Sequence, residues 1–503
     1  MIDFLFNTDY FIFLFALLLI IGVVATKFSS KFGVPALVLF IVVGMIAGDD
    51  GLGLIEFGNA SLAKLFGMIA LIIILFEGGL QTKWDAVKPV AYPAITLATL
   101  GVLLTAVFTG IAARFILDLT WLEALLFGSI VGSTDAAAVF AVLRGKNIKS
   151  RLGTTLEAES ASNDPMAMFL TISFIQLIQT DDSSILSLIP QFFWQMGIGL
   201  LIGYVLGKAG VWVLNKINLD SGGLYPVLGL GIAASTYGTA SLIGASGLLA
   251  VYVVAIVIGN AEFPYRHMIT RFSEGLAWMM QILMFVVLGL LVFPSEIIGP
   301  IMLKGLLLSL ILMLVARPIS VFVIVAFFKY RLKENIFLAW SGLRGAVPIV
   351  LATFPMLAGL EQSQMFFNVI FFVVLTSALI QGSTISPLAS KLGLVEDDQP
   401  SPAHSIELVS IGKTNAEIIE YVVKDQDDVA HKPIADLALP ENALINAIIR
   451  NDEVITPFGS TVIQPHDILF ILVNKDKIKD LKQALMKRKK KDEFDKEVVD
   501  GQY

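Results

Sequence analysis

The chain has 503 residues, of which 56% are hydrophobic and 15% are charged, and its net charge at pH 7 is −7. A soluble protein of this length carries far more polar surface, so the composition predicts a polytopic membrane protein. The sequence contains no cysteine, which excludes disulfides, thiolate metal sites and cysteine nucleophiles. The 21 basic and 21 acidic side chains up to residue 391 cancel, and the 14 basic and 21 acidic ones after it leave the negative charge in the tail. No basic surface is available for a nucleic acid.

Apolar segments follow one another through the first 390 residues. The first begins at Tyr10 without a basic start or an obvious cleavage site, so we expect a membrane span and not a signal peptide. Thirteen segments are long enough to cross a bilayer as helices. They lie at roughly 9–26, 33–48, 61–80, 89–113, 121–143, 151–178, 185–214, 222–240, 243–260, 272–293, 299–328, 334–358 and 365–389. The glycine-rich junction between 222–240 and 243–260 also fits a re-entrant segment.

Basic residues between the segments predict the orientation. With the N-terminus outside, sixteen Lys and Arg residues fall in inner loops, and only Lys64, Arg114 and Lys304 fall in outer loops. Cytoplasmic loops carry such an excess of positive charge. Because the number of spans is odd, the C-terminal tail is then expected in the cytoplasm, below the cell membrane.

The tail is predicted to form a separate, small α+β domain. We expect a membrane domain at 1–394, a linker at 395–403, a regulatory domain at 404–486 and a charged end at 487–503. The domain contains alternating or β-branched runs, such as IIEYVV, NALINAIIR and DILFILV, separated by turn residues that are typical of a small sheet. The stretch KDKIKDLKQALMKRKKKDEF predicts a final helix whose basic end is solvated rather than bound to anionic lipid.

A few charged residues lie within the predicted spans, where an ionisable group costs several kcal/mol and therefore indicates a function. They are Glu77, Asp135, Glu157, Glu159, Asp164, Glu274, Arg317 and Arg344. Glu157 and Glu274 are predicted to be exposed helix ends near the inner interface. Arg317 lies roughly 18 Å deep, about twelve residues from the inner end of its span, and so needs a counter-ion. Glu159 is the natural candidate, in a pair that holds two helices together.

Residues 159–165 read ESASNDP. On a helix, Ser160 and Asp164 share one face because they are four residues apart, and Glu159 and Asn163 share the adjacent face. Glu159 and Asp164 are five apart, which separates them by about 140° around the axis. The two carboxylates are therefore predicted to have separate tasks, one paired and one free.

Two spans are interrupted by glycine and short polar residues: GSIVGSTDAAAV at 128–139 and SGLRGAVPIV at 341–350. Broken helices leave backbone dipoles free at mid-membrane, where they bind ions. The breaks lie in the fifth and twelfth spans, as two inverted repeats would place them, and each carries a charge, Asp135 or Arg344. The glycines at 199, 203 and 207 are predicted to serve helix packing instead.

The combination of ESASNDP, SGLRGAVP and STDAAAV resembles the monovalent cation–proton antiporters of the sodium/proton-exchanger type, over about 380 residues. The resemblance implies an all-α membrane protein of about thirteen helices, with inverted repeats and two crossed discontinuous helices. It also implies a homodimer in which a core of the fourth to sixth and eleventh to thirteenth spans moves past a scaffold.

The resemblance assigns roles to individual residues. Asp164 would bind the cation or the proton, with oxygen ligands from Ser160 and Thr134. Other residues would shape or support the crossing of the breaks: Asn163, Asp135, the pair Glu159 and Arg317, and Arg344. Glu77 matches an acidic position near the site in some relatives. Family members with Asn before the aspartate tend to be electroneutral.

The tail resembles the C-terminal subdomain of proteins that regulate potassium conductance, through KPIADL, AIIR and QPHD. His466 stands where that family usually has glycine. The resemblance implies dimerisation and, as in some bacterial relatives, regulation by cyclic di-AMP. No GxGxxG motif follows a soluble strand, so NAD binding is not expected, nor is another cofactor.

Together these features predict an antiporter that exchanges K⁺ or Na⁺ for H⁺ one for one, and not an enzyme. Hard alkali cations prefer oxygen ligands, and proton and cation would compete for Asp164. The tail favours potassium. The alternative is a ligand-gated cation channel, although no TVGYG-like filter occurs. An intramembrane aspartyl protease would need a Gly-x-Gly-Asp context that neither Asp135 nor Asp164 has, and a sensor that transports nothing would not need so many intramembrane charges.

Overall fold

A computed structural model of the chain describes residues 2–32, 35–55, 57–143, 147–180, 185–263, 265–293, 295, 299–396, 416–423, 427–450, 453–474, 477, 480, 481, 484 and 485. The chain divides into two compact units, residues 1–397 and 398–503. Residues 397–403 of the predicted linker, the predicted charged end at 487–503 and most of the predicted final helix lie outside the described residues. The predicted domain boundaries stay predictions.

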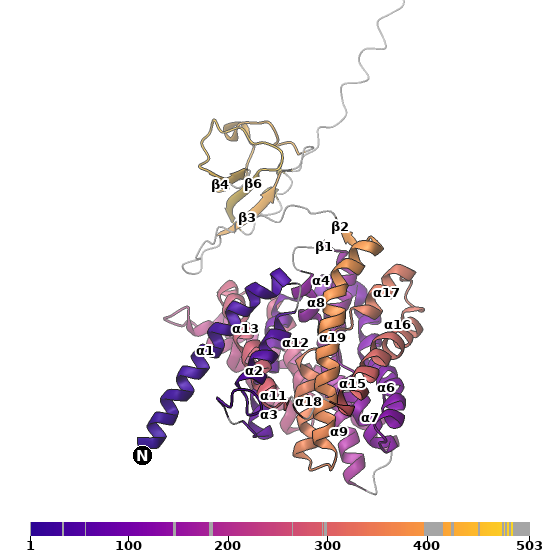
Figure 1. Cartoon of the computed structure of the whole chain (residues 1–503). Helices are drawn as coiled ribbons and strands as arrows, with labels where there is room; N and C mark the ends of the chain where they lie inside the picture. Colours follow the sequence, from indigo (N-terminus) through magenta and orange to yellow (C-terminus); the bar gives the residue numbers. More distant parts are fainter. Residues whose placement is uncertain are drawn as a thin grey trace, which may run out of the picture. The chain divides into compact units, whose positions relative to one another are not determined.

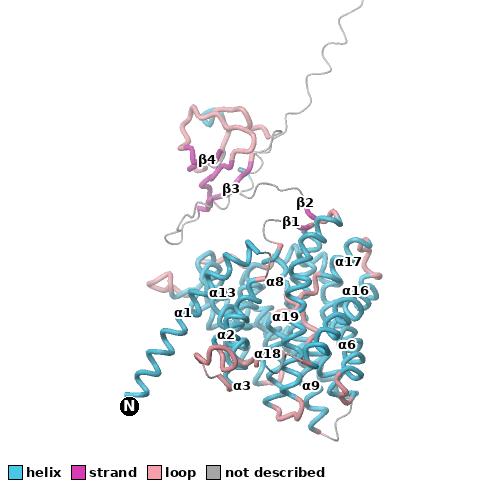
Figure 2. The backbone as a smooth tube through the Cα atoms, viewed as in Figure 1, coloured by secondary structure: helices cyan, strands magenta, loops and turns pink. Residues whose placement is uncertain are grey.

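Helices make up nearly all of the first unit (Figures 1 and 2), and every predicted apolar segment overlaps with helical structure. The chain begins with α1 (Ile2–Phe32), α2 (Ala36–Ala47) and α3 (Ala60–Gln81). The fourth segment runs through α4 (Trp84–Val87), η1 (Lys88–Val90), α5 (Ala91–Thr96), the π-helical turn η2 (Leu97–Gly101) and α6 (Val102–Ile116).

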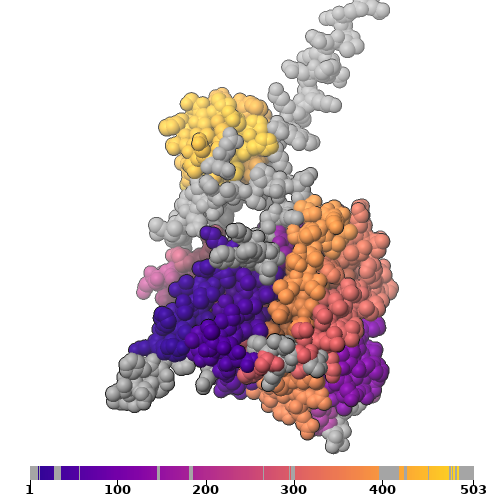
Figure 3. Space-filling model, in the orientation of Figure 1, coloured from indigo at the N-terminus to yellow at the C-terminus, as the bar shows by residue number. Residues whose placement is uncertain are grey.

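Further helices follow along the chain. They are α9 (Ser150–Gln179), the 3₁₀ turn η3 (Ile185–Ser187) with α10 (Leu188–Lys216), α11 (Leu224–Leu242), α12 (Gly247–Gly259), α13 (Arg266–Leu290) and α19 (Ser363–Leu392). The eleventh segment is α15 (Pro300–Ile311), the π-helical turn η4 (Leu312–Ala316) and α16 (Arg317–Val325). The glycine-rich junction forms two helices, α11 and α12, joined by a turn. In Figure 3, α19 (orange) adjoins the N-terminal helices (indigo) and contacts α2.

Apolar side chains cover the outside of this helical unit. Phe115, Trp212 and Leu242 are 76%, 64% and 89% exposed, which is typical of a surface that meets lipid. Among the described residues, six helical stretches are long and apolar enough to cross a membrane: 60–81, 84–116, 185–216, 266–290, 301–325 and 363–392. The helical membrane fold is therefore confirmed, and the count of thirteen crossings stays a prediction.

The two predicted helix breaks are present. Between α7 (Trp121–Ile130) and α8 (Ala136–Val142) the chain is non-helical at 131–135, and between α17 (Leu332–Trp340) and α18 (Ala346–Leu357) it is non-helical at 341–345. The backbone N–H of Asp135 donates to the carbonyl of Leu343 at 2.7 Å, so the two breaks lie against each other. The short strands β1 (Asn147–Ile148) and β2 (Val395–Glu396) pair antiparallel and join the end of this region to the end of α19.

The predicted packing role of the glycines in α10 is confirmed by its contact with α12. A Cβ atom at Gly203 would lie 2.6 Å from the carbonyl oxygen of Ala250 and 2.7 Å from the Cβ of Val253. Gly199 and Gly207 face Ser246 and Val257 in the same way. Small residues at these positions let the two helix backbones approach closely.

The second unit contains a four-stranded antiparallel sheet with the order β3-β6-β4-β5. The strands are β3 (Ala416–Val422), β6 (Ile468–Asn474), β4 (Leu444–Arg450) and β5 (Glu453–Ile455), where alternating runs predicted them. Asp467, with no exposed surface, accepts hydrogen bonds from Arg450 Nε at 2.8 Å and Nη2 at 2.7 Å. These bonds raise the pKa of Arg450. His466 has a φ of 69°, the left-handed conformation that explains the usual glycine.

We predict that Gly203→Ala lowers the free energy of unfolding by about 1–3 kcal/mol, because the added methyl overpacks the contact with α12. Gly197→Ala, on the same helix, is the matched control, since no atom lies within 4 Å of its Cβ position. It should be neutral or stabilise by up to about 1 kcal/mol. SDS titration of the purified protein measures both, and an equal loss in the two variants would contradict the close contact.

Candidate functional site

The middle of α9 supplies most of the polar side chains that the sequence singles out. Pro165 lies inside this helix and has no N–H, so the carbonyl of Ala161, four residues earlier, loses its usual helical partner. The same turn of α9 faces the non-helical segment between α7 and α8. Polar groups of a side chain and of an open backbone thus meet in the interior of the helical unit.

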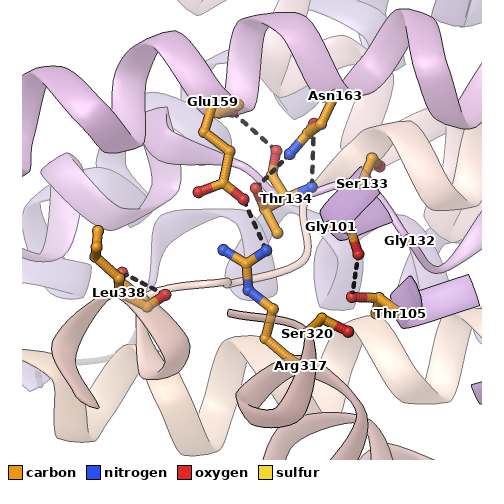
Figure 4. Close-up of polar contacts among 12 residues, drawn as sticks. Gly101, Thr105, Gly132, Ser133, Thr134, Glu159, Asn163, Arg317, Ser320 and Leu338 are labelled. Carbon is orange, nitrogen blue, oxygen red and sulfur yellow. Dashed lines mark hydrogen bonds and ion pairs between the residues drawn. The ribbon is translucent and has the colours of Figure 1, made fainter. Parts of the chain in front are cut away.

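Asn163 holds Thr134 in the first break, as Figure 4 shows. Its Nδ2 donates to Thr134 Oγ1 at 2.6 Å, and its Oδ1 accepts from the backbone N–H of Thr134 at 3.3 Å. Asn163 has no exposed surface. An amide suits this position because it offers one donor and one acceptor side by side. The residue that precedes Asp164 is therefore a support of the break.

Ser160 bonds to the same break from the next turn of α9. Its Oγ donates to the carbonyl of Thr134 at 2.8 Å and accepts from the N–H of Ala136 at 2.9 Å. The Thr134 carbonyl, the Thr134 hydroxyl and the Ser160 hydroxyl each keep lone-pair capacity after these bonds. Three oxygen atoms are thereby held in place beside Asp164, one turn further along the helix.

Asp164 is 7% exposed, and its Oδ1 makes no hydrogen bond within the described part of the chain. No described basic side chain forms an ion pair with it. A buried carboxylate without a counter-ion is costly, and a bound proton or cation removes that cost. Of the two carboxylates in ESASNDP, this is the free one.

Glu159 is the paired carboxylate. Its Oε1 lies 2.7 Å from Arg317 Nη1, and the two side chains are 1% and 2% exposed (Figure 4). Arg317 is the first residue of α16, directly after the π-helical turn η4. Gly342 leaves room for the guanidinium, because a Cβ there would lie 2.7 Å from Arg317 Nε. The pair joins α9 to α16 and brings the second break close.

Arg344 connects the two breaks. Its Nη1 donates to the carbonyls of Gly132 at 2.6 Å and Ser133 at 2.5 Å, and its backbone N–H donates to Ser377 Oγ at 3.2 Å. The guanidinium of one break thus satisfies carbonyls that the other break has freed. Asp135 closes the arrangement: its Oδ1 accepts from the N–H of Ala138 at 3.0 Å and caps α8.

A cavity of about 420 Å³ adjoins this crossing. Its lining includes Asp164, Ser160, Thr134, Asp135 and Glu77. It extends past Gln81 and Thr82 at the end of α3, next to the basic residues Lys83 and Lys88. The cavity therefore connects the free carboxylate to the side of the unit where the basic loops lie.

The structure thus brings five of the predicted cation-site residues to one cavity and puts Asn163, Glu159, Arg317 and Arg344 behind it as supports. One prediction is wrong: Glu157 is not an exposed helix end but is half-buried and lines the cavity. Glu274 is half-exposed, and Arg271 lies 3.9 Å from it. The sequence did not predict Ser377, which accepts from Arg344, or Gln281 and Tyr252, which line the cavity, because single polar residues in apolar runs have no distinguishing pattern.

Comparisons with known proteins agree with these features. Residues 13–391 match the family described as the transmembrane sodium/hydrogen exchanger, and residues 418–486 match the TrkA-C domain. The K⁺/H⁺ antiporter NhaP2 of Shewanella oneidensis is 40% identical over 461 residues, 91% of this chain and 80% of the relative. The K⁺/H⁺ antiporter NhaP of Alkalimonas amylolytica is 39% identical over 471 residues, 93% and 82% of the two chains. The structure of the sodium proton antiporter MjNhaP1 from Methanocaldococcus jannaschii has a TM-score of 0.66 at 25% identity and covers 76% of this chain and 98% of its own.

Fold and site together define a helical membrane protein with a buried, oxygen-lined acidic cavity where two broken helices cross. The chain belongs to the sodium/hydrogen exchanger family and carries a TrkA-C domain in its tail. The resemblance that the motifs indicate is confirmed. Its relatives are transporters and not enzymes.

We predict that Glu159→Gln destabilises the protein by about 3–5 kcal/mol, because it leaves the Arg317 guanidinium buried without a counter-ion. The Glu159→Met/Arg317→Met double variant should recover most of the loss. Asp118→Asn is the control. It removes the ion pair between Arg114 and the 98% exposed side chain of Asp118, and it should cost less than about 1 kcal/mol. SDS titration decides, and a double variant as unstable as Glu159→Gln would refute the pairing.

Proposed function

We propose that the chain exchanges a monovalent cation for protons across a membrane. The observation that carries this proposal is Asp164, a buried carboxylate that has no counter-ion among the described residues and shares a cavity with the oxygens of Ser160 and Thr134. Alkali cations are hard and favour oxygen ligands, which this set of groups supplies. The K⁺/H⁺ and Na⁺/H⁺ antiporters among the relatives support the same function.

Coupling follows from the single negative charge. Either a proton or a cation neutralises Asp164, and once one of them is bound no negative charge remains to bind the other. The loaded site can cross the membrane because its charge is cancelled, and the empty anion is held back by its desolvation cost. One cation then leaves for each proton that enters, without net charge movement. Asn163, which makes both of its bonds to Thr134 as a neutral amide, supports this electroneutral 1:1 exchange.

The access change is proposed to be an elevator movement of a core past a scaffold. The Ser160–Thr134 bond, the polar bonds of Arg344, the Glu159–Arg317 pair and the Asp135–Leu343 bond together join five predicted spans to one another: the fifth, sixth, eleventh, twelfth and thirteenth. Groups tied in this way move as one body. Contact with α3 is different in kind: Gly67 packs directly against Val350 of α18. Among the described residues, Thr82 at the end of α3 also bonds to Glu157 of α9. A contact that is mainly apolar, with so few polar bonds, permits sliding.

Inverted repeats are proposed from two kinds of irregularity. The helix breaks lie in the fifth and twelfth predicted spans, and the π-helical turns η2 and η4 lie in the fourth and eleventh. In each case the separation is seven spans. Two unrelated irregularities with the same separation support a chain built from two similar halves.

We propose potassium as the favoured cation, because the relatives at about 40% identity are K⁺/H⁺ antiporters. The N-terminus is proposed to lie outside and the tail in the cytoplasm, from the distribution of basic residues. The tail domain is proposed to dimerise with the chain's second copy and to bind a regulatory nucleotide such as cyclic di-AMP. A ligand-gated channel is not favoured, since the named relatives are antiporters.

We predict that Asp164→Asn abolishes cation-driven proton exchange, because a neutral amide binds neither the cation nor the proton as the carboxylate anion does. Dye-reported pH changes in proteoliposomes after K⁺ or Na⁺ addition measure it, with cyclic di-AMP added in a parallel series. Asp85→Asn, an exposed acid in the first turn of α4, is the matched control and should exchange normally. An Asp164→Asn protein with the normal exchange rate would overturn the proposal.

We predict that Asn163→Asp makes transport electrogenic, because the added carboxylate can carry a second proton for each cation. Currents on solid-supported membranes test this: the unaltered protein should give none in the steady state, and the variant should give a cation-dependent current. Thr134→Ser keeps the hydroxyl that Asn163 contacts and should remain without current. A steady current from the unaltered protein would contradict electroneutral exchange.

A further inference from the structure

Glu157 is the acidic residue of α9 to which the proposed exchange assigns no role. It lies half-buried on the lining of the cavity that contains Asp164. Among the described residues, no Lys, Arg or His forms an ion pair with it. A carboxylate that is neither exposed at a helix end nor neutralised by a partner needs another explanation.

The spacing along α9 puts Glu157 in line with the cation site. Glu157, Ser160, Ala161 and Asp164 are separated as i, i+3, i+4 and i+7, so they share one helix face, and all four line the cavity. Seven residues correspond to a rise of about 10 Å. The stripe leads from Asp164 toward the basic loops, past oxygen atoms at each turn.

The surroundings of Glu157 come from other helices. Glu77 of α3, Thr82 directly after α3 and Tyr252 of α12 also line this cavity. The Tyr252 side chain is 5% exposed, and its hydroxyl has no hydrogen-bond partner in the described part of the structure. The lone pairs of this hydroxyl are therefore available to a further partner in the cavity.

Thr82 holds the Glu157 carboxylate without neutralising it. Its Oγ1 lies 3.1 Å from Glu157 Oε1 and 2.8 Å from the carbonyl of Gly78. A hydroxyl both donates and accepts, so Thr82 can donate to Glu157 as an anion or accept from it as an acid. Asn260 fixes this end of α3, because it donates to the Thr82 carbonyl at 2.8 Å and accepts from the N–H of Trp84 at 2.9 Å.

We propose that Glu157 is a docking group for the incoming monovalent cation on the inner access path. This rests on the proposed antiport function and adds a residue to it. The cation first meets Glu157, with hydroxyl oxygens from Tyr252 and Thr82 nearby, and then moves along the stripe to Asp164. Because Glu157 lies on one side of Asp164, it acts on cations that arrive from that face and not from the other.

The size of the effect follows from Coulomb's law. A unit charge about 10 Å from a cation site changes the dissociation constant of the cation by roughly two- to fifteenfold for effective dielectric constants between about 80 and 20. We therefore expect Glu157→Gln to raise the KM for K⁺ at the inner face by about three- to tenfold. The maximum rate should stay within about twofold, because Asp164 is intact.

The experiment compares everted and right-side-out membrane vesicles, which offer the inner and outer faces to added K⁺ or Na⁺. Exchange is followed by a pH-sensitive dye over a range of cation concentrations. Glu157→Asp retains the charge and should keep the inner KM within about twofold of the unaltered protein. Asp85→Asn removes an acid from the same end of the unit without touching the cavity, and should shift neither KM.

A rise in the inner KM alone, rescued by Glu157→Asp, supports the docking role. An unchanged KM in Glu157→Gln, or an equal change at both faces, overturns it. A loss of maximum rate in both Glu157→Gln and Glu157→Asp also overturns it, because the side chain is then structural. If the unaltered protein exchanges no cation for protons, the proposed function fails instead.

Discussion

The structure depends on one constraint: polar groups that enter a hydrocarbon layer must find their partners inside the protein. Two helices break in the interior of the first unit, and each break frees backbone carbonyls and N–H groups. The breaks satisfy each other, since Arg344 donates to Gly132 and Ser133 and the N–H of Asp135 donates to Leu343. Asn163 and Ser160 satisfy Thr134 from α9. Once these bonds are made, Asp164 is left as the carboxylate at the crossing without a described partner.

The contrast between Glu159 and Asp164 shows how position on one helix determines the task of a carboxylate. Five residues separate them, so they point to different neighbours. Glu159 faces Arg317 and forms an ion pair with almost no exposed surface. Desolvation offsets much of the stability that such a pair contributes, but the pair fixes the geometry of the two helices. Asp164 faces the cavity. The crossing is held rigid while the Asp164 carboxylate stays unpaired. A bound cation or proton can therefore neutralise that carboxylate.

Much of this arrangement could be predicted from the sequence, and the reasons are physical. Helical spacing separates Glu159 from Asp164, and glycine runs with a charge mark the breaks, because few other features explain such residues in an apolar segment. Glu157 was misjudged because spacing alone does not tell which helices cover a helix end; α3 and α12 reach over it. The bond partners of Ser377 and Asn260 depend on tertiary contacts between distant segments, which periodicity does not contain.

In its proposed role, Glu157 gives the cation a first binding position on the way to Asp164. One unpaired carboxylate deep in the protein would attract cations from both faces equally, and access would depend only on which way the core faces. A second carboxylate about two turns nearer the basic loops breaks that symmetry. Its negative charge would reduce the repulsion that the basic residues Lys83 and Lys88 exert on an approaching cation. In the proposed orientation the basic inner loops would repel the proposed cation, and an acidic cavity lining would reduce that repulsion.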